Sequence, residues 1–315
     1  MNKVLSLAYF AGGSKFTLEP FKVLKDSKHK LQIVYTKEPK RAGRGKKKNQ
    51  NILFKEVIKN NIRIKTLNDF TNIGNIKALK DLNLDFIIVF SFGLILPKEI
   101  LKIPKYGCIN IHTSLLPKWR GASPVQHTLL NNEKETGYTL IIMNEELDEG
   151  NIIYKQRMEI DDKYNYGTLL DKLVNLASIN LVKNIESFAN NIIKPEAQNH
   201  SEASYCYRIK KEDTYINFNC SASEVLGKIR AFSPTPGAKC YLKGELIKIL
   251  DAKIDGEKKE NKKFGYVTDK NLLISCKYGF IRFIKVQRAG RKAMYAKELL
   301  NGWDVEEGSI VNEEK

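Results

Sequence analysis

Hydrophobic and polar positions follow two different patterns along this chain, and the change falls near residue 190. In the first part, short apolar runs alternate with segments whose apolar residues recur every three to four positions, which is typical of βαβ units. The apolar runs predict strands at 4–10, 31–35, 86–90, 107–112 and 138–143. The periodic segments predict helices at 16–24, 53–59, 124–130 and 168–188. We therefore expect an α/β fold around a mostly parallel sheet.

Beyond a polar, Asn-rich stretch, the pattern changes to short β-rich segments separated by glycine and charged turns. Strands are predicted at 238–242, 246–254, 265–267, 271–275 and 280–286. A run of short strands favours a small barrel or sandwich, and an OB-like barrel is one form that binds oligonucleotides. We expect a first domain over residues 1–189, a linker over 190–206 and a C-terminal OB-like β-barrel domain over 207–315.

Composition supports two folded domains without a membrane span. The chain has 315 residues, of which 42% are hydrophobic, with 14 Phe and 14 Tyr, and disordered chains lack such aromatic content. Every uninterrupted apolar run is shorter than the roughly 18 residues of a bilayer span. The apolar start resembles a signal peptide, but Gly12-Gly13 suits a turn after a buried strand and no A-x-A site follows, so we expect the mature chain to begin at Met1.

The five cysteines lie far apart and contain no C-x-x-C pair, so the sequence indicates neither a disulfide framework nor a zinc site. A reducing cytoplasm fits this usage best.

The net charge of +17 indicates a polyanionic partner such as nucleic acid. Of the basic residues, 43 are Lys and 10 are Arg, so AT-rich codon usage is an alternative explanation of the overall charge. The distribution is more informative, because 37–48 holds seven basic side chains and 282–297 holds six. Both clusters are candidate phosphate contacts, and a solvated charged face is the alternative for each.

The stretch from Gly107 to Gly121 carries the candidate chemistry. Alternate residues of a strand share a face, so Asn110 and His112 should project together while Ile109 and Ile111 face the other way. The strand ends at the edge of the sheet where open α/β folds bind their ligands. Asp148 follows a later apolar strand, and we expect it on a loop at the same edge. An amide, an imidazole and a carboxylate together suit acyl or formyl transfer, since the first two can stabilise an oxyanion.

Several segments of this chain, in the same order and spacing, resemble the 10-formyltetrahydrofolate-dependent formyltransferase superfamily. Three lie in the first part: N-I-H-T-S-L-L-P-K-W-R-G at 110–121, L-D-E-G at 147–150 and S-F-G-L-I-L-P at 91–97. The basic segment 40–47 resembles the insertion loop of the members that act on methionyl initiator tRNA, and 229–238 and 287–294 resemble their C-terminal domain.

The resemblance implies a Rossmann-like catalytic domain followed by an OB-like barrel, and transfer of a formyl group from 10-formyltetrahydrofolate to the α-amine of methionyl initiator tRNA. Three residues match the family's catalytic trio: Asn110, His112 and Asp148. The folate loop corresponds to Ser114, Leu115, Leu116 and Pro117. The tRNA contacts are expected at Lys40, Arg41, Arg44, Lys46, Lys47, Lys285, Arg288 and Arg291. No metal is expected, and we anticipate a cytoplasmic monomer.

Two departures from the family pattern concern loop shape and packing. Gly12-Gly13-Ser14-Lys15 replaces the usual G-T-P followed by an acid, and Thr235 stands where an aromatic residue is common. Neither position belongs to the trio. Formyl transfer to an amino-sugar nucleotide, and a tRNA-binding protein without catalysis, are the alternatives; the basic segments argue against the first and the intact trio against the second.

Overall fold

The computed structural model describes residues 3–38, 50–70, 73–256 and 259–312. The chain forms two compact units, and neither is a single continuous segment. The first unit comprises residues 1–121, 137–158 and 170–205, and the second comprises 122–136, 159–169 and 206–315. Two excursions of the chain therefore belong with the C-terminal part, and the predicted boundaries at 189 and 206 stay a prediction.

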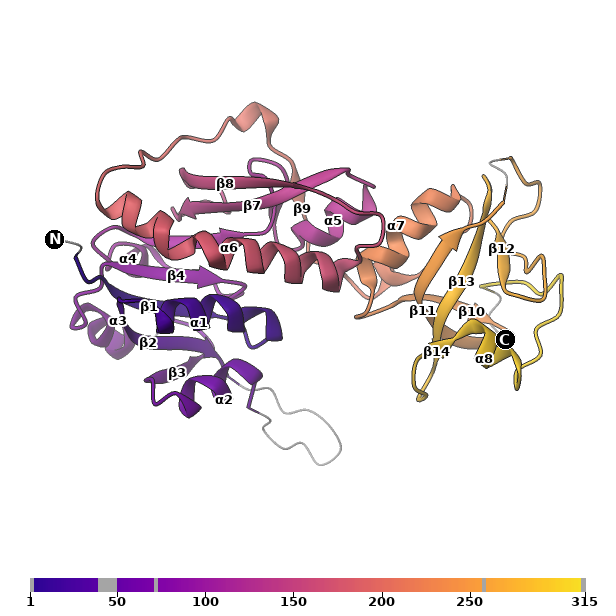
Figure 1. Ribbon diagram of the computed structural model, residues 1–315, viewed down its shortest axis with the longest axis horizontal. Helices are drawn as coiled ribbons and strands as arrows, with labels where there is room; N and C mark the ends of the chain where they lie inside the picture. The colour runs from indigo at the N-terminus through magenta and orange to yellow at the C-terminus, as the bar shows by residue number, and fades with distance from the viewer. Residues whose placement is uncertain (1–2, 39–49, 71–72, 257–258, 313–315) are drawn as a thin grey trace. The chain divides into compact units, whose positions relative to one another are not determined.

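The first unit is built on a seven-stranded sheet with the order β3-β2-β1-β4-β5-β7-β8 (Figure 1). Its strands are β1 (Ser6–Ala11), β2 (Lys30–Lys37), β3 (Ile64–Leu67), β4 (Phe86–Phe90), β5 (Cys108–His112), β7 (Glu135–Ile142) and β8 (Ile152–Glu159). Neighbouring strands from β3 to β5 are parallel, and β7 pairs antiparallel with β5. The predicted mostly parallel sheet is confirmed, and all five predicted strands of this part are present.

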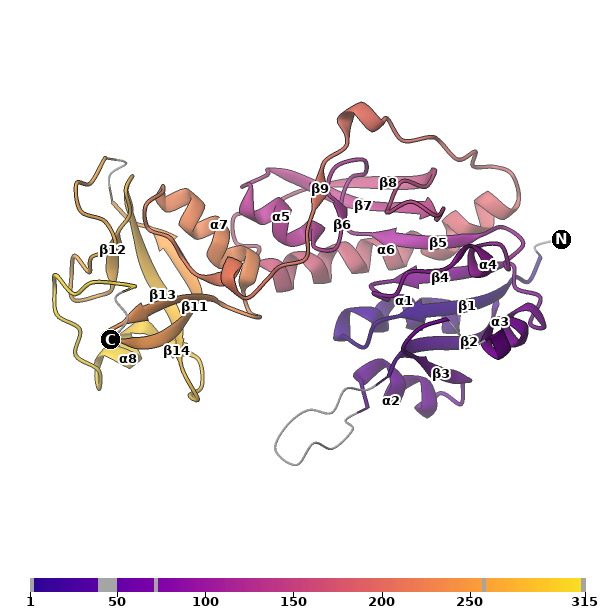
Figure 2. The ribbon, with the colours of Figure 1, turned by 180° about the vertical axis from the view of Figure 1, so that it is seen from behind.

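Helices cover both faces of this sheet. They are α1 (Leu18–Asp26), α2 (Ile52–Lys59), α3 (Ile73–Lys80), α4 (Lys98–Leu101) and α6 (Tyr166–Ala189), and a 3-10 turn (Lys15–Thr17) precedes α1. Helices α1 and α6 lie on one face, and α3 and α4 lie on the other (Figures 1 and 2). Because both faces are covered, the central strand β4 is buried along its whole length, which explains its continuous apolar sequence.

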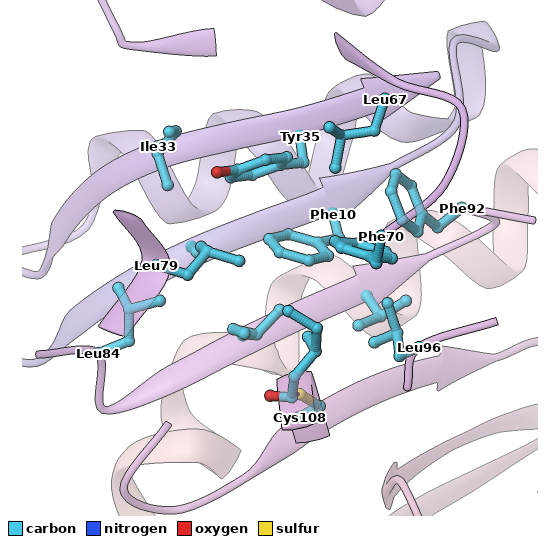
Figure 3. Packing of buried hydrophobic residues seen from close by; sticks show 14 residues of the cluster. Phe10, Ile33, Tyr35, Leu67, Phe70, Leu79, Leu84, Phe92, Leu96 and Cys108 are labelled. Atoms are coloured by element: carbon cyan, nitrogen blue, oxygen red, sulfur yellow. The ribbon is translucent and has the colours of Figure 1, made fainter. Parts of the chain in front are cut away.

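The core on the face of α3 and α4 is rich in aromatic rings (Figure 3). The ring of Phe10 lies 4.7 Å from Tyr35, 5.4 Å from Phe92 and 5.9 Å from Phe70, measured between centroids. Such pairs contribute about 0.5–1.5 kcal/mol each beyond the burial of their area. This packing fixes β1 and the segment after β4, which both lead to the carboxyl edge of the sheet.

The second unit contains an antiparallel sheet with the order β10-β11-β13-β12, and β14 pairs with β13. Its strands are β10 (Ala238–Leu242), β11 (Glu245–Ile254), β12 (Leu273–Ser275), β13 (Phe280–Arg288) and β14 (Met294–Tyr295). Its helices are α5 (Pro124–Leu130), α7 (Ala222–Phe232) and α8 (Ala296–Leu300), with a 3-10 turn at Glu212–Thr214. The β-rich character predicted for this part is confirmed, and its sheet is antiparallel. The predicted strand at 265–267 consists instead of isolated bridges at Tyr266 and Val267.

A third, two-stranded sheet joins β6 (Arg120–Gly121) to β9 (Tyr205–Cys206), and a 3-10 turn (His200–Glu202) precedes β9. The described helices include none that is both long enough and apolar enough to cross a membrane.

Candidate active site

Strand β5 places two of the predicted site residues on one face. Asn110 and His112 are two positions apart, while Ile109 and Ile111 are buried on the opposite face. His112 is only 5% exposed. The predicted strand and its alternation are therefore confirmed, and both polar side chains project beside the loop between β7 and β8.

The Asp148 side chain joins these two residues. Its Oδ1 accepts a hydrogen bond from Asn110 Nδ2 at 3.2 Å, and its Oδ2 lies 3.6 Å from His112 Nδ1. The backbone N–H of Gly121 also donates to Oδ2, at 2.9 Å. The structure therefore brings together Asn110, His112 and Asp148, which are separated by up to 38 residues in the sequence.

The orientation of His112 is fixed by a backbone carbonyl. His112 Nε2 lies 2.9 Å from the carbonyl oxygen of Trp119, and a carbonyl can only accept, so Nε2 carries a hydrogen. Trp119 adopts φ +61°, a left-handed conformation that turns this carbonyl toward the imidazole. Nδ1, which faces Asp148, is therefore the ring nitrogen that is able to gain and lose a proton.

The loop that carries Asp148 depends on a glycine. A Cβ at Gly150 would lie 1.8 Å from the backbone oxygen of Ile142, so no side chain fits there. Asp148 itself has φ +55°, a conformation that costs a non-glycine residue free energy. This geometry explains the glycine that ends the L-D-E-G segment.

The predicted folate loop is tightly held by hydrogen bonds. Thr139 Oγ1 donates to the carbonyl of Ser114 at 2.7 Å and accepts from the backbone N–H of Leu116 at 3.1 Å. Ser114 Oγ donates to the carbonyl of Lys118 at 2.6 Å. Ser114, Leu116 and Pro117 are buried, whereas Leu115 is half-buried. These hydrogen bonds fix the path of the loop, and its role in folate binding stays a prediction.

The predicted tRNA-contacting residues have different surroundings. Lys285 and Arg291 are exposed in the second unit. Arg288 instead forms a bidentate ion pair with Glu245, at 3.0 Å and 2.6 Å, and its guanidinium lies 4.7 Å from the ring of Trp303. The pairing lowers the pKa of Glu245, mainly through this hydrogen bond. The other predicted contacts, Lys40, Arg41, Arg44, Lys46 and Lys47, lie outside the described residues.

Sequence reasoning missed residues of the segment 190–205 that contact the site. Gln198 and Ser204 hydrogen-bond the backbone of Asp148 and Trp119, respectively. The sequence offers no signal for either, because the polar segment lies more than 45 positions beyond its partners and reads as a linker. Among the described residues, no group of three His, Cys, Asp or Glu side chains could hold a metal ion.

Comparison with known proteins gives the same assignment for both parts of the chain. Residues 5–185 match the formyl transferase family, and residues 208–304 match the formyl transferase C-terminal domain. The methionyl-tRNA formyltransferase of Thermodesulfovibrio yellowstonii is 36% identical over 302 residues, covering 95% of this chain and 96% of that protein. The same-named protein of Pelagibacter ubique is 36% identical over 304 residues, covering 96% and 97%.

The fold is shared with a solved N-formyltransferase from Helicobacter canadensis, crystallised with folinic acid and dTDP-3-aminofucose. That structure is 22% identical, with a TM-score of 0.63, and the match covers 91% of this chain and 100% of the other. The two family matches together take in nearly the whole chain, and both relatives are 36% identical over at least 95% of it. This chain therefore belongs to the formyl transferase family.

Proposed function

We propose that this chain transfers the formyl group of 10-formyltetrahydrofolate to the α-amine of methionyl initiator tRNA. The observation that carries the chemistry is the contact of one carboxylate, Asp148, with both Asn110 and His112. The acceptor is supported by the 36% identity with enzymes named methionyl-tRNA formyltransferase.

The folate co-substrate would bind at the carboxyl edge of the sheet, beside the loop Ser114, Leu115, Leu116 and Pro117. Strands β4 and β5 end there next to each other, and open α/β sheets bind ligands at this edge. The folinic acid named for the Helicobacter canadensis protein supports a folate as the co-substrate.

The reaction needs one bond made, one bond broken and one proton moved. The neutral amine of methionine bonds to the formyl carbon, and the carbonyl oxygen becomes an oxyanion. Asn110 Nδ2 has a second hydrogen besides the one that it donates to Asp148, and it would donate that hydrogen to the oxyanion. When the bond from the formyl carbon to N10 breaks, the proton that the amine has lost ends on N10.

His112 would carry that proton through Nδ1, because Nε2 already donates to Trp119. The protonated imidazole is a cation, and the carboxylate of Asp148 at 3.6 Å would stabilise it. Asp148 would thus orient Asn110 and balance the charge on His112 at the same time.

The second unit would contact the tRNA through exposed basic residues of an OB-like barrel. Lys285 and Arg291 are accessible for phosphate contacts. Arg288 already has a carboxylate partner, so we assign it a smaller part in tRNA binding. Arg44 and its basic neighbours would contact the acceptor end, as the resemblance implies.

We also propose that the protein is a cytoplasmic monomer without a bound metal, with domains at 1–189 and 207–315. All five cysteines are free thiols, which fits a reducing compartment. Light scattering coupled to gel filtration tests the monomer directly.

One assay tests the function and its rivals. Purified protein is incubated with 10-formyltetrahydrofolate and either methionyl initiator tRNA, methionyl elongator tRNA or a dTDP-amino sugar, and the formylated product is measured. We expect product with the initiator alone. Product from the amino sugar would favour the sugar acceptor, and tRNA binding without any product would indicate a binding protein.

A further inference from the structure

We propose that Gln198, held by the buried Arg120, is a positioning residue that fixes Asp148 for formyl transfer; this inference rests on the function proposed above. The carboxamide of Gln198 lies between the Asp148 loop and the Arg120 guanidinium. Its Nε2 donates to the carbonyl of Asp148 at 2.8 Å and to that of Gly150 at 2.8 Å. Its Oε1 accepts from Arg120 Nε at 3.1 Å and from Nη2 at 2.9 Å.

These four hydrogen bonds fill the capacity of the side chain. A carboxamide has two hydrogens and two acceptor sites, and all are used here. The orientation is also unambiguous, because the guanidinium can only donate and the two carbonyls can only accept. A residue of another type at this position would leave buried groups unpaired on one side or the other.

Arg120 is placed to hold Gln198 still. Its side chain is fully buried, at 0% exposure, and β6 fixes its backbone through a hydrogen bond to the carbonyl of Ser204 at 2.8 Å. The remaining guanidinium nitrogen, Nη1, lies 2.8 Å from Glu149 Oε1 and 3.2 Å from the hydroxyl of Tyr205. A buried cation is stable only when it has hydrogen-bond partners and a counter-charge. These partners bind three nitrogens of the Arg120 guanidinium and so fix its orientation.

Polar contacts hold the Asp148 loop: besides Gln198, the Asp148 carboxylate binds Asn110 and Gly121, and Glu149 pairs with Arg120. Leu147, the apolar residue beside Asp148, is 64% exposed, so hydrophobic packing does not anchor the loop there. Asp148 also has the unfavourable φ of +55°, and strained conformations persist where the surroundings over-determine them. Gln198 adds a restraint on the backbone itself, because its two hydrogen bonds fix the carbonyls on both sides of Glu149.

The experiment compares Gln198→Ala and Gln198→Glu in the full-length protein. The glutamate retains an acceptor for Arg120 but cannot donate to the two carbonyls. If Gln198 acts on Asp148, both variants lose kcat on the order of 10²-fold, the effect of a displacement of about 1 Å, while the KM values for tRNA and folate stay near wild type. If Gln198 merely satisfies Arg120, Gln198→Glu keeps the wild-type kcat, and the proposal is overturned.

Two further measurements separate positioning from general damage. In single-turnover assays, Gln198→Ala should cause no additional loss in an Asp148→Ala background, because residues that act as a unit cannot be removed twice. An additional loss equal to that in the wild-type background would also overturn the proposal. The matched control is Gln156→Ala on β8, whose Oε1 accepts from Tyr138 and Asn180; it should retain the wild-type kcat.

Hydrogen exchange provides a readout that does not depend on the reaction. Amides of residues 144–151 should exchange faster in both Gln198 variants than in wild type, and the Gln156→Ala protein should exchange there like wild type. Unchanged exchange in the Gln198 variants would refute the positioning role even if formylation is confirmed. Faster exchange in a protein that formylates no tRNA would instead defeat only the proposed function.

Discussion

At the scale of single residues, the site depends on one carboxylate with several partners. Asp148 accepts hydrogen bonds from Asn110 and from Gly121, and it lies next to His112. Its Oδ1 is directed at Asn110, and its Oδ2 is directed at Gly121 and His112. We propose that the amide of Asn110 stabilises the oxyanion and that the imidazole of His112 carries the proton. Substituting each residue separately should distinguish the two roles.

We expect His112→Ala to lower the single-turnover rate of formyl transfer by about 10²- to 10⁴-fold, because a positioned acid or base contributes that much. Asn110→Ala should cost about 10²- to 10³-fold, as for a lost oxyanion donor. Quenched-flow measurement with bound tRNA gives both rates, and filter binding should give unchanged tRNA affinity. A rate near that of wild type for either variant would remove that residue from the mechanism.

Gly150→Ala should destabilise the first unit by about 1–3 kcal/mol, the usual cost of overpacking, because the new Cβ would lie 1.8 Å from the Ile142 backbone oxygen. The loop must move to relieve this contact, so kcat should fall as well. Gly302→Ala is the control, since no atom lies within 4 Å of its added Cβ. Calorimetry measures the Tm of the two variants. An equal Tm would argue against the close approach of Gly150 to the Ile142 backbone.

At the scale of elements, the 24-residue helix α6 (Tyr166–Ala189) covers much of one face of the sheet (Figures 1 and 2). Its buried stripe includes Leu173, Ala177, Leu181 and Ile185. These positions follow helical spacing, so the stripe faces the sheet along the length of the helix.

Leu173→Ala should lower the free energy of unfolding by about 2–5 kcal/mol, because this side chain is 0% exposed and its loss leaves a cavity. Ile179→Ala on the same helix should change it by less than about 0.5 kcal/mol, since Ile179 is 73% exposed. Urea unfolding followed by circular dichroism compares the two. Equal midpoints would contradict the assigned orientation of the helix.

Elements with strong periodicity were predictable from the sequence, and weakly patterned ones were not. The central strand β4 and helix α6 were recognised from a continuous apolar run and a regular stripe. Strand β8 was missed because its apolar start is only two residues long, and its remaining positions alternate between half-buried and exposed with mostly polar side chains. Helix α7 was missed although Ser221 and Glu224 form a capping box, which is a readable helix start.

For the site, the sequence indicated which residues share the face of β5, because strand alternation is local. The pattern also placed Asp148 on a loop at the same edge of the sheet, but its contact with His112 came from the resemblance alone, since no local rule relates the two residues. Gln198 could not be found from the sequence. It reaches Asp148 only because the chain turns back to the site after α6, and no local pattern indicates that path.

At the scale of the whole molecule, the net charge of +17 should make the affinity for tRNA depend on salt concentration. If exposed basic residues contact phosphates, the logarithm of the affinity should fall linearly with the logarithm of salt concentration, by about 0.9 per phosphate neutralised. Folate binding should hardly respond. Filter binding across a salt series measures the slope, and a flat response would assign the lysines to solvation of the surface.

Lys285→Gln with Arg291→Gln should weaken binding of all tRNAs alike and reduce that slope by about 2, since backbone contacts position the RNA without reading its sequence. The control removes the same charge from exposed positions of α6, Lys172→Gln with Lys183→Gln, and should leave the slope unchanged. Equal effects of the two pairs would mean that net charge alone drives binding. Arg288→Gln is left out because it would break the ion pair with Glu245.

The segment between α6 and β9 limits how this protein can be divided. It leaves the helix at Ala189 and returns to the site, where Gln198 holds the Asp148 loop and the Ser204 hydroxyl accepts a hydrogen bond from the backbone N–H of Trp119. A chimera joined at the end of α6 would retain Asn110, His112 and Asp148. The segment that contacts their loops, including positions 198 and 204, would then come from the other protein. When C-terminal parts are exchanged between relatives, activity should therefore be retained only if the junction lies after Tyr205. The part of the chain needed for the active site thus extends beyond the end of α6.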